Sequence, residues 1–200
     1  SGRLSVSMRI GINFSLINVI ISLSFIMKLT PFKLEKKSKK PIVYAFIDSQ
    51  NLNLGIQDQG WRLDFGRFRI YLKDKYHITK AFLFIGYIPK YKKLYNSLKN
   101  FGYVLIFKPT LPRLNGETKG NVDAELVLHA MIELPHYDKS VIISGDGDFH
   151  CLIEYLENNR KLARVIIPNR KKYSQLLWKF NRHIDYLNNL KEKLGETKKG

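Results

Sequence analysis

The sequence predicts an α/β domain with a largely parallel central sheet, and two features of the chain from Pro41 onward carry this prediction. Short apolar segments rich in β-branched and aromatic residues alternate with longer segments whose apolar residues recur every three or four positions. The short segments also lack polar alternation, which is typical of strands covered by helices on both faces. The chain has 200 residues, 44% of them hydrophobic, so one globular domain with tails is expected.

The individual elements follow from these patterns in chain order. Residues 42–47, with the sequence IVYAFI, form the first predicted strand. The alternation of strands and helices after it favours parallel crossover connections. The chain from Lys191 is charged and is expected to be frayed. The other predicted strands are residues 80–87, 103–107, 140–144 and 163–167, with 183–187 as an edge strand, and the predicted helices are residues 64–75, 89–100, 121–134, 149–159 and 173–180.

The charge and the single cysteine limit the cellular setting. The formal net charge is +17, and residues 41–200 carry +10 of it, because residues 1–40 hold eight Lys or Arg and one Glu. A basic surface attracts polyanions, of which nucleic acid is the commonest, although an anionic membrane also satisfies the charge. Cys151 is the single cysteine, which excludes an intrachain disulfide and favours a reducing, cytoplasmic location.

The chain divides into an N-terminal extension at residues 1–40, a domain at 41–188 and a charged tail at 189–200. The extension contains an apolar run at residues 10–27 that approaches the length of a membrane span, followed by a basic linker at 28–40. Two interpretations stay open. We prefer a translation start at Met27; the other is a membrane anchor with the following lysines on its cytoplasmic side. No cleavage site of the Ala-x-Ala type follows, which disfavours a secretory signal.

Acidic residues follow two of the predicted strands. Asp48 comes directly after the first strand, and Asp146 and Asp148 come directly after the fourth. Asp123 lies in the first turn of the helix that leads into that fourth strand. Because ligand sites of open parallel sheets lie beyond the carboxyl ends of the strands, we expect the four carboxylates to approach one crevice.

Four carboxylates in one crevice imply either raised pKa values or a bound cation. In a chain this rich in Lys and Arg we favour the cation. Oxygen ligands without a His or Cys cluster select hard ions such as Mg²⁺ or Mn²⁺, which can activate a water for attack on a phosphodiester. The site therefore predicts hydrolysis of phosphodiester bonds.

Each of these residues also has a purely structural explanation. Asp48 could be a turn residue, Asp148 an N-cap before Phe149, and Asp123 a favourable charge at a helix start. Their joint arrangement favours a site, as do Gly145 and Gly147, which are expected to permit the tight backbone conformations that expose Asp146 and Asp148. Three further polar residues lie in these loops, Ser49, Asn51 and Ser144. They could bind phosphate or support the carboxylates, or they could simply form turns.

Three segments, FIDSQNL, KGNVD and SGDGDF, resemble the signature segments of the NYN domain in its LabA-like branch, formerly grouped as a domain of unknown function. The resemblance covers residues 42–187 and has the segments in the expected order. It implies a PIN-like three-layer α/β/α fold and metal-dependent cleavage of RNA. It places the acidic site at Asp48, Asp123, Asp146 and Asp148, with Asn51 as a polar partner. Lys119 lies at the basic position of the family motif. It could contact phosphate, or it could be an ordinary solvated lysine of the loop.

Two segments interleave basic and aromatic residues, residues 90–95 and 170–173. Lys92 and Lys93 are candidates to contact phosphates while neighbouring tyrosines stack on unpaired bases. The alternative is an ordinary solvated helix face whose tyrosines pack on the core. Residues 109–120 are a candidate lid or substrate clamp. The histidines have no metal-ligand spacing, although His150 lies close to the SGDGDF segment.

Other classes of function compete with the ribonuclease. A catalytically silent RNA-binding module would keep the same fold and basic surface. A phosphatase of the haloacid-dehalogenase type needs a second Asp two residues after the first, where this chain has Gln50. A membrane-tethered interaction protein rests only on residues 10–27. RNA is the expected partner. The sequence gives no oligomeric state, and a homodimer stays open because proteins with exposed edge strands and a shared substrate groove often dimerise.

Overall fold

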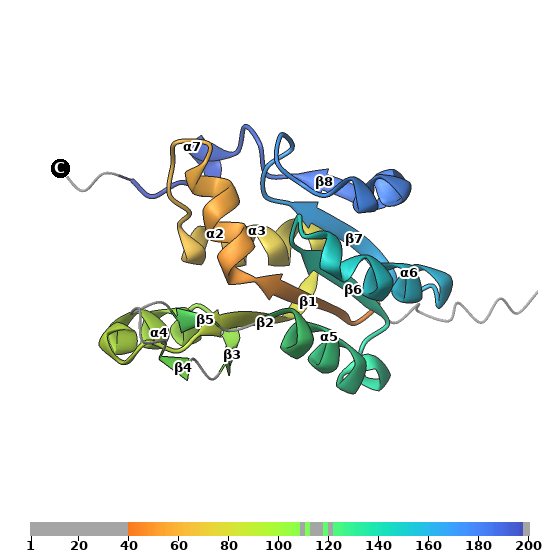
Figure 1. Cartoon of the computed structure of the whole chain (residues 1–200), viewed down its shortest axis with the longest axis horizontal. Helices are drawn as coiled ribbons and strands as arrows, with labels where there is room; N and C mark the ends of the chain where they lie inside the picture. The colour runs from red at the N-terminus through yellow and green to blue at the C-terminus, as the bar shows by residue number, and fades with distance from the viewer. Residues whose placement is uncertain (1–39, 109–110, 113–117, 120–121, 198–200) are drawn as a thin grey trace, which may run out of the picture. The chain divides into compact units, whose positions relative to one another are not determined.

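A six-stranded sheet forms the centre of the domain (Figure 1). The computed structural model describes residues 40–108, 111–112, 118–119 and 122–197. The strand order is β3-β2-β1-β6-β7-β8, and neighbouring strands are parallel throughout. The predicted parallel sheet is therefore confirmed. Its strands are β1 (Val43–Asp48), β2 (Ile78–Gly86), β3 (Tyr103–Lys108), β6 (Lys139–Ile143), β7 (Leu162–Ile167) and β8 (Ile184–Tyr186).

Helices cover both faces of the sheet and complete the predicted three layers. Ala45 and Ile47 of β1 enter a core cluster with residues of α2, α3, α4 and α7, whereas Phe46 enters a second cluster with residues of α5, α6 and η4. Alternate residues of one strand thus enter two cores, which explains why the strand is apolar throughout. The helices are α2 (Ser49–Gln57), α3 (Phe65–Tyr76), α4 (Lys92–Asn100), α5 (Val122–Ile132), α6 (His150–Asn158) and α7 (Lys191–Leu194), with short 3-10 helices η1 (Pro89–Tyr91), η2 (Leu134–His136), η3 (Gly147–Phe149) and η4 (Gln175–His183).

The direction in which the sheet grows reverses at β1. The chain adds β2 and β3 on one side of β1 and then returns to add β6, β7 and β8 on the other. At such a reversal the connections leave the carboxyl ends of the two strands toward opposite faces, and a crevice opens between them. The ends of β1 and β6 therefore border the crevice in which a ligand is expected.

Helix α2 is an element that the sequence patterns did not predict. Its segment SQNLNLGIQ is rich in residues of low helix propensity. Tertiary contacts stabilise it instead: Leu52 and Ile56 are fully buried, and the Asp48 carboxylate caps its first turn. The four-residue spacing of Leu52 and Ile56 was the available indication of a helix.

The prediction of a frayed chain from Lys191 is wrong for its first residues. Lys191–Leu194 form helix α7, and Leu194 is buried in the core. The Leu194 carbonyl accepts a hydrogen bond from the Asp64 N–H at 2.8 Å, and Gly195 forms an antiparallel bridge with Leu63. The Glu196 N–H completes this bridge by donating to the Arg62 carbonyl at 3.0 Å. One apolar side chain and one pair of backbone hydrogen bonds thus anchor a segment whose composition is mostly charged.

Two predicted segments lie largely outside the described residues. In the segment 109–120, the backbone of β4 (Leu111–Pro112) pairs antiparallel with β5 (Thr118–Lys119), and neither the other residues nor the Lys119 side chain is described. Of the extension at 1–40, only Lys40 is described. The predicted lid and the apolar run at 10–27 therefore stay predictions. Among the helices that are described, none is both long and apolar enough to cross a membrane.

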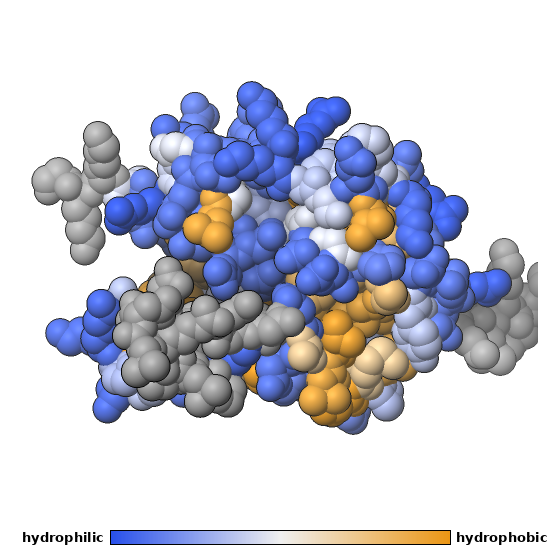
Figure 2. All heavy atoms as spheres, in the orientation of Figure 1, coloured by the Kyte–Doolittle hydropathy of each residue, from blue (hydrophilic) through white to orange (hydrophobic). Residues whose placement is uncertain are grey.

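The face seen in Figure 2 is mostly hydrophilic, with apolar side chains gathered over α5. Leu128 and Ile132 of this helix are 53% and 56% exposed. Exposed apolar surface on a soluble domain can serve for association when it forms a contiguous patch. The homodimer that the sequence leaves open is not tested by this observation.

Candidate active site

Asp48 lies at the end of β1 and is held by protein donors on both carboxylate oxygens. Its side chain is buried, with 4% exposure. Oδ1 accepts hydrogen bonds from the backbone N–H groups of Gln50 and Asn51, each at 3.1 Å, and so caps α2. Oδ2 accepts a hydrogen bond from Ser144 Oγ at 3.2 Å. Asp48 therefore ties the first turn of α2 to the end of β6.

A second polar contact ties the same two loops together. Asn51 Oδ1 accepts a hydrogen bond from the Gly145 N–H at 2.8 Å, and Ser144 Oγ accepts one from the Asp146 N–H at 3.1 Å. The Ser144 hydroxyl thus accepts a hydrogen bond from the Asp146 N–H while it donates one to Asp48. Asn51 and Ser144 thus connect the loop after β1 to the turn that carries Asp146. Phosphate binding by either residue stays a prediction.

Three carboxylates converge beside this junction. Asp123, in the first turn of α5, and Asp146 and Asp148, in the turn after β6, each place a carboxylate oxygen within 4.8 Å of the other two. Asp146 Oδ1 also accepts a hydrogen bond from the Asp148 N–H at 3.0 Å and caps η3. Asp148 is exposed and the other two are half-buried. The N-cap role considered for Asp148 is therefore performed by Asp146.

The structure separates Asp48 from this group. Its carboxylate lies outside the set that approaches within 4.8 Å, although its charge acts on Asp123. Burial raises the pKa of Asp48, and the hydrogen bonds from Asn51, Ser144 and Gln50 oppose that rise. Three of the four predicted carboxylates thus converge, and the buried Asp48 is coupled to them through its charge, since Asp146 raises the pKa of Asp48 and Asp48 raises that of Asp123. The joint site of all four stays a prediction.

The pKa of Asp123 shows that negative charge accumulates in the crevice. Burial raises the pKa of Asp123 above its ordinary value, and the charges of Asp146, Asp48 and Asp148 raise it further. The positive charge of Lys108, at the end of β3, opposes this rise. Like charges held this close favour a bound cation.

Lys108 is a residue that the sequence analysis missed. Its Nζ is buried and has no hydrogen-bond partner within the described part of the chain. Burial lowers the pKa of Lys108, and the negative charges of Asp123 and Glu125 oppose this effect. In the sequence Lys108 is only the residue after an apolar strand, so nothing local distinguishes it from a solvated lysine.

The glycines of the turn are required for space rather than for backbone conformation, which corrects the prediction. Neither Gly145 nor Gly147 is among the described residues with positive φ. A Cβ atom on Gly147 would lie 2.3 Å from Ser174 Oγ, and one on Gly145 would lie 3.0 Å from Tyr173 Cβ. The segment before η4 therefore packs directly on the turn that carries Asp146 and Asp148.

The remaining candidates lie apart from the carboxylates or outside the description. Lys92 and Lys93 are exposed at the start of α4. Ser49 is buried beside Asp48 and lines a cavity described below. Tyr95 is buried and its hydroxyl bonds to the backbone of Ile88 and Gly86, so the core-packing alternative holds for it. Tyr173 contacts Tyr186 through its hydroxyl at 3.2 Å, and His150 Nδ1 lies 3.0 Å from the Gly147 carbonyl.

Comparison with known proteins places this geometry in a family. The family model of the NYN domain matches residues 43–187. The chain belongs to the NYN domain family. The low amplitude and bright protein LabA of Synechococcus elongatus is 27% identical over 165 residues, which cover 77% of this chain and 88% of LabA. A solved structure of a protein of unknown function from Vibrio parahaemolyticus has a TM-score of 0.63 at 22% identity and covers 78% of this chain and 98% of that one.

These findings confirm the resemblance to NYN and LabA-like proteins that the three sequence segments indicated. The NYN domain of this chain has a PIN-like fold with an aspartate cluster at the crevice between β1 and β6. Family and cluster together indicate a nuclease. The structure of the Vibrio protein supports the fold and carries no statement about activity.

Proposed function

We propose that this NYN domain is a metal-dependent ribonuclease that hydrolyses RNA phosphodiester bonds within the strand. The observation that carries the proposal is the approach of the Asp123, Asp146 and Asp148 oxygens within 4.8 Å at the crevice where the sheet reverses. The basic chain supplies the long-range attraction for a polyanionic substrate.

The donor set fits Mg²⁺ or Mn²⁺. The three converging groups offer carboxylate oxygens, which hard divalent ions prefer, and the raised pKa of Asp123 reports negative charge that such an ion would neutralise. When bound, a divalent ion of this kind supplies an activated water and offsets charge on the leaving oxygen. Asp123, Asp146 and Asp148 would hold it.

The other residues of the site act on geometry and on the substrate. Asp48 is assigned to the same acidic site, where its hydrogen bonds to α2 and Ser144 hold the Asp146 turn in position. Lys108 offers an amine that has no hydrogen-bond partner among the described residues and interacts with Asp123, and it is suited to a phosphate oxygen. Lys92, Lys93 and Lys119 are assigned to phosphates further along the strand, and Ser49 and Asn51 to the supporting loop.

The decisive experiment is cleavage of labelled RNA by the full chain in Mg²⁺, Mn²⁺ or EDTA. A linear strand tests cleavage, and a circular strand without ends tests whether the cut is internal. Asp146→Asn removes one charge from the cluster, and Asp74→Asn removes one from an exposed position on α3. We expect metal-dependent cleavage of both RNAs by the parent chain and by Asp74→Asn, and cleavage reduced by about a thousandfold in Asp146→Asn.

The competing function is an RNA-binding module without catalysis. It is the outcome if RNA binds at low salt, no metal ion supports cleavage, and Asp146→Asn binds RNA as the parent does. Cleavage of the linear strand with no cleavage of the circle would instead limit the proposal to an exonuclease.

A further inference from the structure

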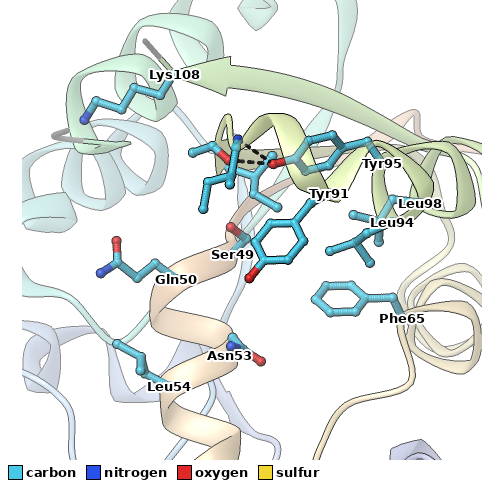
Figure 3. Close-up of a pocket in the computed structure, with 13 residues that line it drawn as sticks. Ser49, Gln50, Asn53, Leu54, Phe65, Tyr91, Leu94, Tyr95, Leu98 and Lys108 are labelled. Carbon is cyan, nitrogen blue, oxygen red and sulfur yellow. Dashed lines mark hydrogen bonds between the residues drawn. The ribbon is translucent and has the colours of Figure 1, made fainter. Parts of the chain in front are cut away.

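A cavity of about 430 Å³ lies beside the acidic site, between α2 and α4 (Figure 3). Ser49, Gln50, Asn53 and Leu54 of α2 form one wall. The other walls come from the start of α3, the end of β2 and helices η1 and α4, and Lys108 of β3 borders the cavity as well. We call this space the α2–α4 cavity. Its volume falls within the range of sites for small organic groups, about 300–1,000 Å³.

The lining combines aromatic, aliphatic and amide groups. The ring of Tyr91 extends from η1 toward α2, and Phe65 and Leu94 lie on the same side of it (Figure 3). The amide groups of Gln50 and Asn53 come from successive turns of α2. Tyr91 is 42% exposed, so its ring is accessible for stacking, in contrast to Tyr95, which is 4% exposed. A flat group with polar edges fits such a lining.

Two contacts connect the α2–α4 cavity to the carboxylates. Gln50 borders the cavity and donates its backbone N–H to Asp48 Oδ1 at 3.1 Å. Lys108 lines the cavity too, while its amine interacts electrostatically with Asp123. Two residues that border the cavity thus also act on carboxylates of the crevice, Gln50 on Asp48 and Lys108 on Asp123.

We propose that the α2–α4 cavity holds one unpaired nucleobase of the RNA strand, next to the phosphate that is cleaved. The Tyr91 ring stacks on the base, Asn53 hydrogen-bonds its polar edge, and Lys108 contacts the phosphate between the base and the carboxylates. This assignment rests on the proposed ribonuclease function. Single-stranded RNA is recognised in this way because its bases can be splayed out and stacked on aromatic side chains.

The proposal has a consequence for substrate choice. A base inside a duplex must unstack and unpair before it can enter the cavity, and this step opposes binding. The domain is therefore selective for single-stranded segments over duplex RNA. The Asn53 amide can act as donor and acceptor, so it favours a base without selecting one base strongly.

The test combines a substrate change with a protein change. A single abasic site is placed at successive positions of a short single-stranded RNA, and cleavage is measured for the parent chain, Tyr91→Ala and Tyr91→Phe. We expect one abasic position to lower kcat/KM by about 10- to 100-fold, the range for loss of one stacked base. Tyr91→Ala should lower kcat/KM by a similar factor on intact RNA. On the abasic strand the same variant should lower kcat/KM little further, since both changes remove the same contact. Tyr91→Phe keeps the ring and restores cleavage.

A matched control separates stacking from general effects of losing a tyrosine. Tyr155 on α6 is also 42% exposed, and α6 covers the opposite face of the sheet. Tyr155→Ala is expected to cleave intact and abasic RNA as the parent chain does. Two results would overturn the assignment. One is that Tyr91→Ala and the abasic site lower kcat/KM independently, so that their effects multiply. The other is that all abasic strands are cleaved equally.

A binding measurement decides the case if no cleavage is observed. In EDTA, a strand carrying a fluorescent adenine analogue is titrated with the parent chain and with both alanine variants. Quenching by the parent and by Tyr155→Ala, lost in Tyr91→Ala, supports the base site even though the ribonuclease function has failed. Absence of quenching by the parent chain, or equal quenching by Tyr91→Ala, rejects the base site whatever the cleavage assay shows.

Discussion

The carboxylates of the crevice fall into two unlike sets. Asp48 is buried, and both of its oxygens accept hydrogen bonds from the surrounding protein. Asp123, Asp146 and Asp148 are half-buried or exposed and place oxygens within 4.8 Å of one another. One aspartate thus organises two loops, whereas the other three create a concentration of charge. The difference predicts that Asp48 matters mainly for stability and position, and that the other three matter mainly for binding a cation.

The largest expected effect of this division is on catalysis. Asp146→Asn removes a charge from the converging group while keeping the shape of the side chain. We expect kcat/KM for RNA cleavage to fall by about a thousandfold, as loss of several kcal/mol of charge stabilisation gives. Single-turnover cleavage measures it. A decrease of less than about tenfold would mean that the three converging carboxylates are not the reactive site.

The next effect is on folding stability, where substitution of Asp48 should have a larger effect than substitution of a converging carboxylate. Asp48→Ala removes the cap of α2 and leaves the Ser144 hydroxyl without its acceptor in a buried place. We expect a loss of about 3 kcal/mol in the free energy of unfolding. Asp148→Ala, at an exposed position, should change stability by less than about 0.5 kcal/mol. Urea denaturation in EDTA compares them, and equal losses would erase the distinction between the sets.

The strand ends allowed much of this site to be predicted from the sequence. Asp48, Asp146 and Asp148 each follow an apolar strand, and parallel strands bring their carboxyl ends to one edge. Asp123 could be placed because it lies within the first turn of a recognisable helix. These positions depend on local pattern plus one general rule about parallel sheets, so a single sequence suffices for them.

Other features depend on contacts between distant segments. The division between Asp48 and the converging group rests on Ser144, which lies 96 residues from Asp48 and bonds to it. The need for Gly147 arises from Ser174, on a segment that follows β7. Lys108 acquires its role because α5 returns past the end of β3. No local pattern records these approaches, and for the same reason the weakly helical segment of α2 was not predicted as a helix.

Metal binding offers a third comparison between the sets. With Mg²⁺ or Mn²⁺ at about a hundredfold excess over its Kd, the folded chain should gain about 2.7 kcal/mol of stability. The gain should disappear in Asp146→Asn and persist in Asp48→Asn, because the introduced amide retains an oxygen that can cap α2 and Asp48 lies outside the converging group. Thermal unfolding with and without EDTA measures the gain. Its loss in Asp48→Asn would place Asp48 among the ligands.

The smallest expected effect concerns pH in the absence of metal. The pKa of Asp123 is raised by burial and by the neighbouring carboxylates. The folded state therefore holds this proton more tightly than the unfolded state, and the resulting stability is complete below the unfolded pKa and lost as pH rises through the folded one. Asp123→Asn should consequently raise the unfolding temperature in EDTA at neutral pH. The increase should become smaller as the solution is acidified below the ordinary pKa range of an aspartate.

The same substitution should abolish the gain in stability that added metal gives. A variant that is less stable than the parent at neutral pH in EDTA would show instead that the Asp123 carboxylate stabilises the fold, as Asp48 does, and would move it from the converging set to the organising one.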